Sequence, residues 1–271
     1  MQLLDRTIDL CVPVTDIFRR NQAALLPLVG AVSHKRPDGE RIGGKVEMLE
    51  SSLNIAAADF PRRIEADGWL AALKTGRFAS FSCDIGPACD VATTRSSNGY
   101  PRYVALSPVC SEDEYVARSL DNVRFLRREF GGPIKVENLN YFPVAGHEVV
   151  CEPAVIRRLI EACGIELLLD IGHLTISAAN LGIPVDTYLA GLPLERVSEL
   201  HVSGSRIING VLEDAHDVPD EREFALIAAI LARTSPRYLT VEYYRDDALL
   251  MSAYRELSRR FVEETTVEER L

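Results

Sequence analysis

The chain lacks any long uninterrupted apolar run. A membrane-spanning helix needs about 20 consecutive apolar residues, and no stretch of the 271 residues approaches that length. The basic and then apolar start of a secretion signal is missing too, since Asp5 and Arg6 follow Met1 closely. We therefore expect a cytoplasmic protein that does not act at a membrane.

Closely spaced cysteine pairs and an excess of basic residues are also missing. The 6 cysteines are scattered without a Cys-x-x-Cys pair, which favours reduced thiols over a disulfide framework or a thiolate-bound structural zinc. The formal net charge of −10 argues against a protein held on nucleic acid by a basic face. Carboxylates gathered in one place would instead bind hard cations.

Linkers, internal repeats and low-complexity blocks are not evident, so we expect a single domain over residues 1–271. Short β-rich runs alternate with amphipathic helical patterns, which is typical of parallel α/β folds. The helical patterns lie at 112–130, 153–163 and 220–233. The expected strands lie near residues 8–13, 45–50, 78–83, 134–138, 165–171, 197–203, 208–213 and 238–243.

Eight strands with helices between them, in a chain of this length, predict a (β/α)8 TIM barrel. Two segments, 27–44 and 85–110, are rich in Pro, Gly, Ser or Asn and show no clear period. We expect both to be long loops, and loops of this length commonly cover a functional face. In a barrel, loops that follow strands lie on the catalytic face.

Acidic residues and histidines stand at the ends of the later expected strands. Because the carboxyl ends of parallel barrel strands meet at one rim, these side chains should converge there. Asp214 and His216 alternate along an extended segment and so can point the same way. The set comprises Glu137, Asp170, His173, His201, Asp214, His216 and Glu242.

Each of these residues has a simpler explanation when taken alone. Glu137 could pair with an arginine, and His201 could be a hydrogen-bonded core histidine. Asp170 could cap the helix that follows it, and Glu242 could stand at a helix entry. Taken together, the residues favour two or three bound cations, because buried charges must be paired or coordinate metal and few basic residues stand beside them in the sequence. Mixed oxygen and nitrogen ligands suit iron, manganese or zinc.

Four segments, KVENLNYF, LLLDIGHLTISAANLG, YLAGLPLERVSELHVSG and NGVLEDAHDVP, together resemble the DUF692 (UPF0276) proteins. These are multinuclear non-haem iron-dependent oxidative enzymes among the xylose isomerase-like TIM barrels. The resemblance covers about residues 105–245 and implies that the strand-end carboxylates and histidines are metal ligands. His173 stands where many of these oxidases have Asn and where related isomerases and endonucleases have His. Asn138 and Asn180 lie within the matching motifs and are candidate substrate-binding residues.

The resemblance also implies a reaction. Iron, as two or three ions, would act with dioxygen as co-substrate on a ribosomally made, Cys-containing precursor peptide, with a separate protein binding the peptide leader. Three alternatives stay open: a metal-dependent sugar isomerase or epimerase, an endonuclease IV-like hydrolase, and a catalytically altered metal-binding relative.

The N-terminal half departs from the family pattern. The family places one histidine at the end of its second strand and another at the end of its third. Those places fall near Glu50 in KVEMLESSL and near Cys83 or Asp84 in FSCDIGP. We expect Glu50 and Asp84 to face the same rim and to replace the two imidazoles as ligands, since carboxylates also bind iron and manganese.

Overall fold

The computed structural model describes residues 8–95, 101–141, 146–208 and 210–262. Parallel strands close into a barrel in the spatial order β1, β12, β9, β8, β7, β4, β3 and β2, and β2 pairs back with β1. This arrangement confirms the predicted TIM barrel. The barrel strands are β1 (Asp9–Pro13), β2 (Ala31–His34), β3 (Val46–Asn54), β4 (Phe81–Asp84), β7 (Ile134–Glu137), β8 (Glu166–Asp170), β9 (Val197–Val202) and β12 (Tyr238–Val241).

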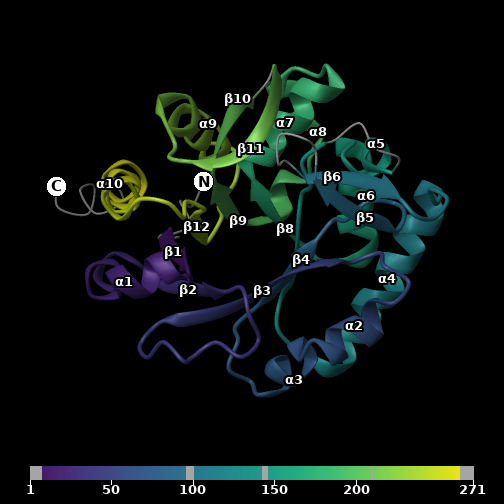
Figure 1. The fold of residues 1–271 in the computed structure, drawn as a ribbon, viewed down its shortest axis with the longest axis horizontal. Coiled ribbons are helices and arrows are strands. Elements are labelled where there is room, and N and C mark those ends of the chain that lie inside the picture. Colours follow the sequence, from purple (N-terminus) through teal and green to yellow (C-terminus); the bar gives the residue numbers. More distant parts are fainter. Residues whose placement is uncertain (1–7, 96–100, 142–145, 209, 263–271) are drawn as a thin grey trace, which may run out of the picture.

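Helices lie around the outside of the barrel (Figure 1). They are α1 (Asp16–Leu25), α2 (Phe60–Ala66), α3 (Trp69–Lys74), α4 (Glu112–Glu129), α5 (His147–Val150), α6 (Pro153–Cys163), α7 (Ile171–Leu181), α8 (Val185–Gly191), α9 (Glu221–Leu231) and α10 (Asp247–Leu257). The expected helices at 112–130, 153–163 and 220–233 match α4, α6 and α9. Within the described ranges, no helix is both long and apolar enough to cross a membrane.

The helix boundaries follow from local capping. The Ser111 hydroxyl accepts the backbone N–H of Glu114 at the start of α4. Helix α6 begins at Pro153 and ends before Gly164, which adopts a left-handed conformation with φ of 62°. Asp220 and Glu223 form a reciprocal capping box at the start of α9. These signals explain why the helices could be placed from sequence.

Seven of the eight expected strands overlap barrel strands, but the one expected at 208–213 does not. That segment belongs to an antiparallel hairpin of β10 (Gly204–Ile208) and β11 (Val211–Asp217). The missing barrel strand is β2, which lies inside the segment 27–44 that we expected to be a loop. Its four residues are all buried, but a run this short gives no recognisable period.

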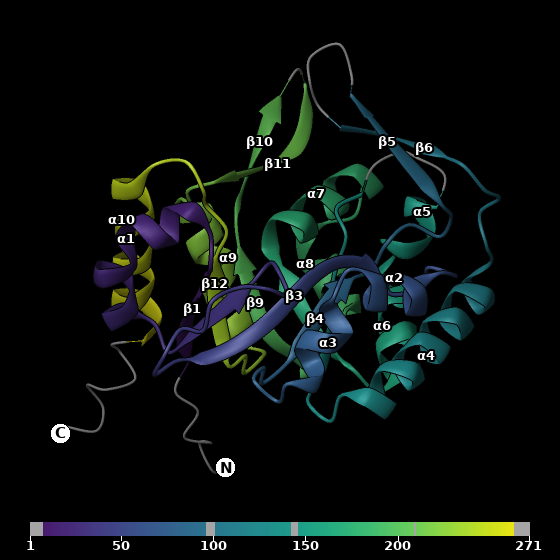
Figure 2. The same ribbon diagram turned by 60° about the horizontal axis from the view of Figure 1, so that its bottom comes forward.

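The second expected loop, 85–110, also contains regular structure. Strands β5 (Val91–Arg95) and β6 (Pro101–Ala105) pair antiparallel, and residues 96–100 between them lie outside the described residues. Figure 2 shows that this hairpin and the β10–β11 hairpin rise at the same end of the barrel. Both follow the carboxyl end of a barrel strand, so they lie on the face where TIM barrels build their sites.

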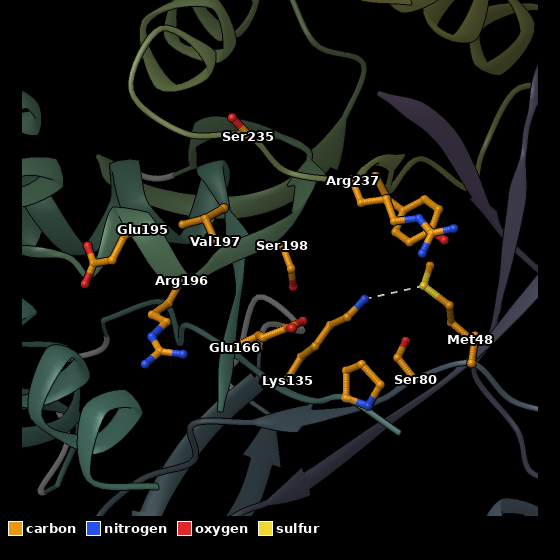
Figure 3. Close-up of a pocket in the computed structure, with 13 residues that line it drawn as sticks. Met48, Ser80, Lys135, Glu166, Glu195, Arg196, Val197, Ser198, Ser235 and Arg237 are labelled. Atoms are coloured by element: carbon orange, nitrogen blue, oxygen red, sulfur yellow. Dashed lines mark hydrogen bonds between the residues drawn. The ribbon is translucent and has the colours of Figure 1, made fainter. Parts of the chain in front are cut away.

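The barrel interior is partly charged. Lys135 of β7 and Glu199 of β9 form a buried ion pair with an Nζ to Oε2 distance of 2.8 Å. Thr240 donates a hydrogen bond to the other oxygen of Glu199 at 2.7 Å. Below this pair, at the amino-terminal end of the barrel, is a cavity of about 310 Å³ that Lys135, Met48 and others line (Figure 3). Glu199 thus lies between this cavity and the carboxyl-terminal end of the barrel.

Candidate metal centre

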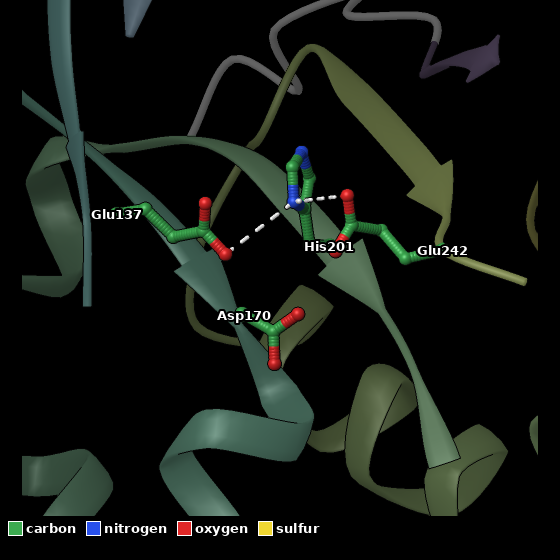
Figure 4. Close-up of side chains that lie close together, drawn as sticks. All are labelled: Glu137, Asp170, His201 and Glu242. Carbon is green, nitrogen blue, oxygen red and sulfur yellow. Dashed lines mark ion pairs between the residues drawn. The ribbon is translucent and has the colours of Figure 1, made fainter. Parts of the chain in front are cut away.

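Four side chains from neighbouring strands converge at the carboxyl end of the barrel. Glu137 ends β7, Asp170 ends β8, His201 lies on β9 and Glu242 directly follows β12. Each offers one ligand atom, and these atoms all lie within 4.8 Å of one another. Figure 4 shows the imidazole of His201 between the carboxylates of Glu137 and Glu242. Parallel pairing explains the convergence, since Asp170 is the register partner of His201.

His201 is fully buried, and in the described part of the chain neither ring nitrogen has a hydrogen-bond partner. Its Nδ1 atom lies 3.6 Å from Glu137 Oε1 and 3.6 Å from Glu242 Oε1. These separations are too long for good hydrogen bonds. The separation from Glu137 does suit two ligands of one ion, because atoms about 2.1 Å from one metal lie roughly 3 to 4 Å apart. His201 is therefore not the hydrogen-bonded core histidine of the simpler explanation.

Asp170 caps the helix that follows it, which is the simpler of the two roles that its position in DIGH allowed. Its Oδ1 atom accepts the backbone N–H of His173 at 2.7 Å and so caps α7. The same carboxylate belongs to the buried cluster. Gly172 makes this turn possible, since a Cβ atom there would lie 2.4 Å from the Ser203 hydroxyl oxygen and 3.2 Å from Asp170 Oδ1. The glycine therefore lets the turn hold the Asp170 carboxylate in the buried cluster.

A hydrogen bond to the backbone carbonyl of Asn138 orients the imidazole of His173. Its Nδ1 atom donates to the carbonyl oxygen of Asn138 at 2.8 Å, while Nε2 lies 3.3 Å from Asp214 Oδ2. This leaves Nε2 as the atom directed at the site, the arrangement usual for metal-binding histidines. The Asn138 amide bonds both backbone groups of Asp170, accepting its N–H at 2.8 Å and donating to its carbonyl at 3.1 Å. Asn138 thereby fixes the end of β8.

Asp214 and His216 reach the cluster from the β10–β11 hairpin and not, as expected, from a barrel strand. The pairing of β11 shifts between Ser205 and Gly204, which leaves a bulge at residues 215–216. His216 has a φ of 41°, a conformation unusual for a residue other than glycine. The bulge directs its Nδ1 to 3.1 Å from Asp214 Oδ2 and its Nε2 to 3.2 Å from Glu242 Oε2.

From the N-terminal half, Glu50 and Asp84 come to the same end of the barrel. Glu50 Oε2 lies 3.9 Å from His201 Nε2. Asp84 ends β4 and is the register partner of Glu137. Lys35, which was not expected from sequence, directly follows β2 and contacts both Glu50 and, at 2.6 Å, Glu242. Lys35 is distant in sequence from these carboxylates, and it could not be placed beside them because β2 was not recognised.

Several carboxyl groups are buried together at this site, and burial disfavours their charged forms. Burial and the neighbouring Glu137 and Glu50 raise the pKa of Asp84 well above its usual value. Burial likewise raises the pKa of Asp170 to about 6. Burial alone would lower the pKa of His201, but Glu242 and Glu50 outweigh it and raise that pKa. Asp84 and Asp170 therefore bind protons more readily than free carboxylic acids do, and a divalent cation bound there would displace those protons.

Two cavities reach candidate metal ligands. One of about 680 Å³ reaches Asp84 and is lined by the ends of β3 and β4. The other, of about 640 Å³, reaches Lys35, His216, Glu242 and Tyr244. Asn180, the second candidate substrate-binding residue, donates its amide to the Tyr141 carbonyl at 3.1 Å. The amides of Asn138 and Asn180 both donate to backbone carbonyls of the protein. Their contact with substrate therefore stays a prediction.

Comparison with solved structures shows a shared fold. The 3-keto-D-glucoside 4-epimerase YcjR of E. coli is 13% identical, with a TM-score of 0.56 over 93% of this chain and 98% of that one. A xylose isomerase-like TIM barrel protein from Mycobacterium smegmatis, in complex with magnesium, is 12% identical, with a TM-score of 0.52 over 82% and 75% of the two chains. Identities this low establish the fold alone.

Sequence comparison is more specific. A UPF0276 protein of Caulobacter sp. (strain K31) is 34% identical over 131 residues, which is 46% of each chain. A UPF0276 protein of Bordetella pertussis (strain Tohama I) is 33% identical over 137 residues, 48% of this chain and 47% of its own length. The chain thus spans about half the length of the curated relatives it matches. The profile of the RiPP precursor modification enzymes MbnB/TglH/ChrH matches residues 94–259, more than half of the chain. The chain belongs to this family of RiPP precursor modification enzymes.

Proposed function

We propose that the chain is a non-haem iron-dependent oxidase that modifies a ribosomally made, Cys-containing precursor peptide. The observation that carries the metal part of this proposal is His201, whose buried Nδ1 atom lies 3.6 Å from Glu137 Oε1, a distance that suits two ligands of one ion. The family match supports a precursor peptide as the substrate. A separate protein would bind the leader of that peptide.

The donor set fits iron. Carboxylates and imidazoles without thiolates suit iron or manganese, and zinc fits less specifically. Glu137, Asp170, His201 and Glu242 would hold one ion. His173, Asp214 and His216 approach one another from α7 and β11 and would hold a neighbouring ion. Bound iron would supply redox chemistry with dioxygen as co-substrate.

The surrounding residues would prepare the site for that chemistry. The Asn138 carbonyl fixes the His173 tautomer with Nε2 directed inward. The α7 cap holds Asp170 in place before any ion binds. The cavities at Asp84 and at Tyr244 would each bind part of an extended peptide near the candidate metal ligands. A Cys side chain of such a peptide could reach the cluster while its flanking residues occupy these cavities.

A direct experiment uses protein purified without oxygen and loaded with Fe²⁺. We expect its absorption spectrum to change when air is admitted. A Cys-containing precursor peptide should change in mass only when both iron and oxygen are present. Protein loaded with Zn²⁺ is the matched control and should leave the peptide unchanged. An iron-loaded protein that is indifferent to oxygen would overturn the oxidase proposal and favour a metal-dependent isomerase or hydrolase.

A further inference from the structure

Lys35 lies where a cation would lie between two carboxylates. Its ammonium group contacts Glu50 Oε1 and lies 2.6 Å from Glu242 Oε1. Both carboxylates are nearly buried, with side chains 8% and 5% exposed, and the lysine side chain is 31% exposed. The three groups come from different strand ends, after β2, within β3 and after β12. Closure of the barrel through β2 therefore brings the ammonium into the site.

The lysine contact restricts which atoms can bind metal. Glu242 Oε1 accepts hydrogen bonds from Lys35 Nζ and, at 2.8 Å, from the Tyr244 hydroxyl. A carboxylate oxygen has about two lone-pair sites, so these two donors use the acceptor capacity of Oε1. The other oxygen, Oε2, faces His216 Nε2 at 3.2 Å. Glu242 can therefore still offer Oε2 to an ion, with Asp214 and His216 or with the other members of the buried cluster, while Oε1 stays with Lys35.

Glu50 is in a similar position. Its Oε1 atom contacts Lys35, and its Oε2 atom lies 3.9 Å from His201 Nε2. It is not among the four residues whose ligand atoms lie within 4.8 Å of one another. An ion between Glu50 and Glu242 would have to displace the ammonium, since two cations so close together would repel each other strongly in a buried site.

We propose that the Lys35 ammonium takes the place of one metal ion, so that the chain binds one ion fewer than its carboxylates would otherwise hold. Glu50 is then an ion-pair partner of Lys35 and not a metal ligand. This rests on the proposed metal centre. It replaces the expectation that Glu50 takes the place of a ligand histidine. The remaining ions would lie among the candidate ligands that Lys35 leaves free, including the Glu242 Oε2 atom, which Lys35 does not contact.

The first test counts metal ions. Wild type and Lys35→Met are loaded with Mn²⁺, passed through a desalting column and analysed by elemental mass spectrometry. Methionine keeps the length of the side chain without its charge. We expect the variant to retain one ion more per chain than the wild type. The double variant Lys35→Met with Glu50→Gln should return to the wild-type number, because the new position loses its carboxylate. Lys74→Met, which removes a lysine paired with Glu129 on the outside, should match the wild type.

The second test does not depend on the folding of Lys35→Met. Glu50→Gln alone should change the Mn²⁺ affinity by less than about twofold, because Glu50 binds no metal in the wild type. If Glu50 is a ligand, its loss should lower the affinity at least tenfold. That result, or equal metal counts in wild type and Lys35→Met, would overturn the assignment of Lys35. A wild type that retains no Mn²⁺ and no Fe²⁺ would instead refute the metal centre itself, and the assignment of Lys35 with it.

Discussion

Asp170 caps the helix that carries His173, with its Oδ1 atom 2.7 Å from the backbone nitrogen of His173. One carboxylate thus both begins α7 and faces the buried cluster. The two roles can be separated, because Asn caps a helix about as well as Asp but lacks the charge that binds a cation. We predict that Asp170→Asn keeps the fold, measured by circular dichroism, and lowers the affinity for Mn²⁺ at least tenfold.

A matched control is available at another helix. Asp220 caps α9, and its side chain accepts the backbone N–H of Arg222 at 2.7 Å, so Asp220→Asn makes the same change at a cap away from the cluster. Its metal affinity should equal that of the wild type. Equal affinities in both variants and the wild type would reduce Asp170 to a helix cap.

The ion pair of Lys135 and Glu199 beneath the site is expected to be important for stability. Both side chains are almost fully buried, so removing one charge leaves the other without its partner. We predict that Lys135→Met lowers the free energy of unfolding by about 3 to 5 kcal/mol. The double variant Lys135→Met with Glu199→Gln should recover part of this loss. Urea denaturation measures both variants, and a double variant no more stable than Lys135→Met would contradict this account.

The parts of the site that could be predicted from sequence are those on elements with a clear local signal. The run before Asp170 is apolar, and the run before Glu137 has apolar residues on either side of Lys135; both end in a polar residue, so the strands and their last residues could be placed. The barrel then follows, because parallel strands with helices between them have few ways to close. Convergence of these side chains needed only the rule that strand ends share a rim.

The parts that could not be predicted depend on tertiary contacts. Strand β2 has four residues, and its place in the barrel comes from pairing with β1 and β3. Without β2, no local pattern places Lys35 beside Glu50. The bulge that brings His216 to Glu242 is likewise set by the register of the hairpin, which alternation along the sequence cannot reveal.

His147, at the start of α5 beside the cavity that reaches Asp84, should make stability depend on pH. Burial lowers its pKa to about 4, below the usual value of about 6.5 for an unfolded chain. The unfolded state then binds more protons between these values, so stability falls as the pH falls through that window. We predict that the wild type loses about 2 kcal/mol more between pH 7 and pH 5 than His147→Gln does.

The measurement is urea denaturation of both proteins at pH 7, 6 and 5. Other groups titrate equally in the two proteins, so the difference between them isolates the histidine. Parallel loss of stability in wild type and variant would show that His147 does not titrate as its burial requires.

The metal content of the purified protein tests the central claim most directly. Elemental mass spectrometry should find a transition metal, with iron the main one, in wild-type protein. The double variant His201→Ala with Asp214→Ala removes one ligand candidate from the barrel and one from the hairpin, and it should lose most of that metal while it stays folded. A fully occupied wild type whose metal content is unchanged in the folded double variant would contradict the account.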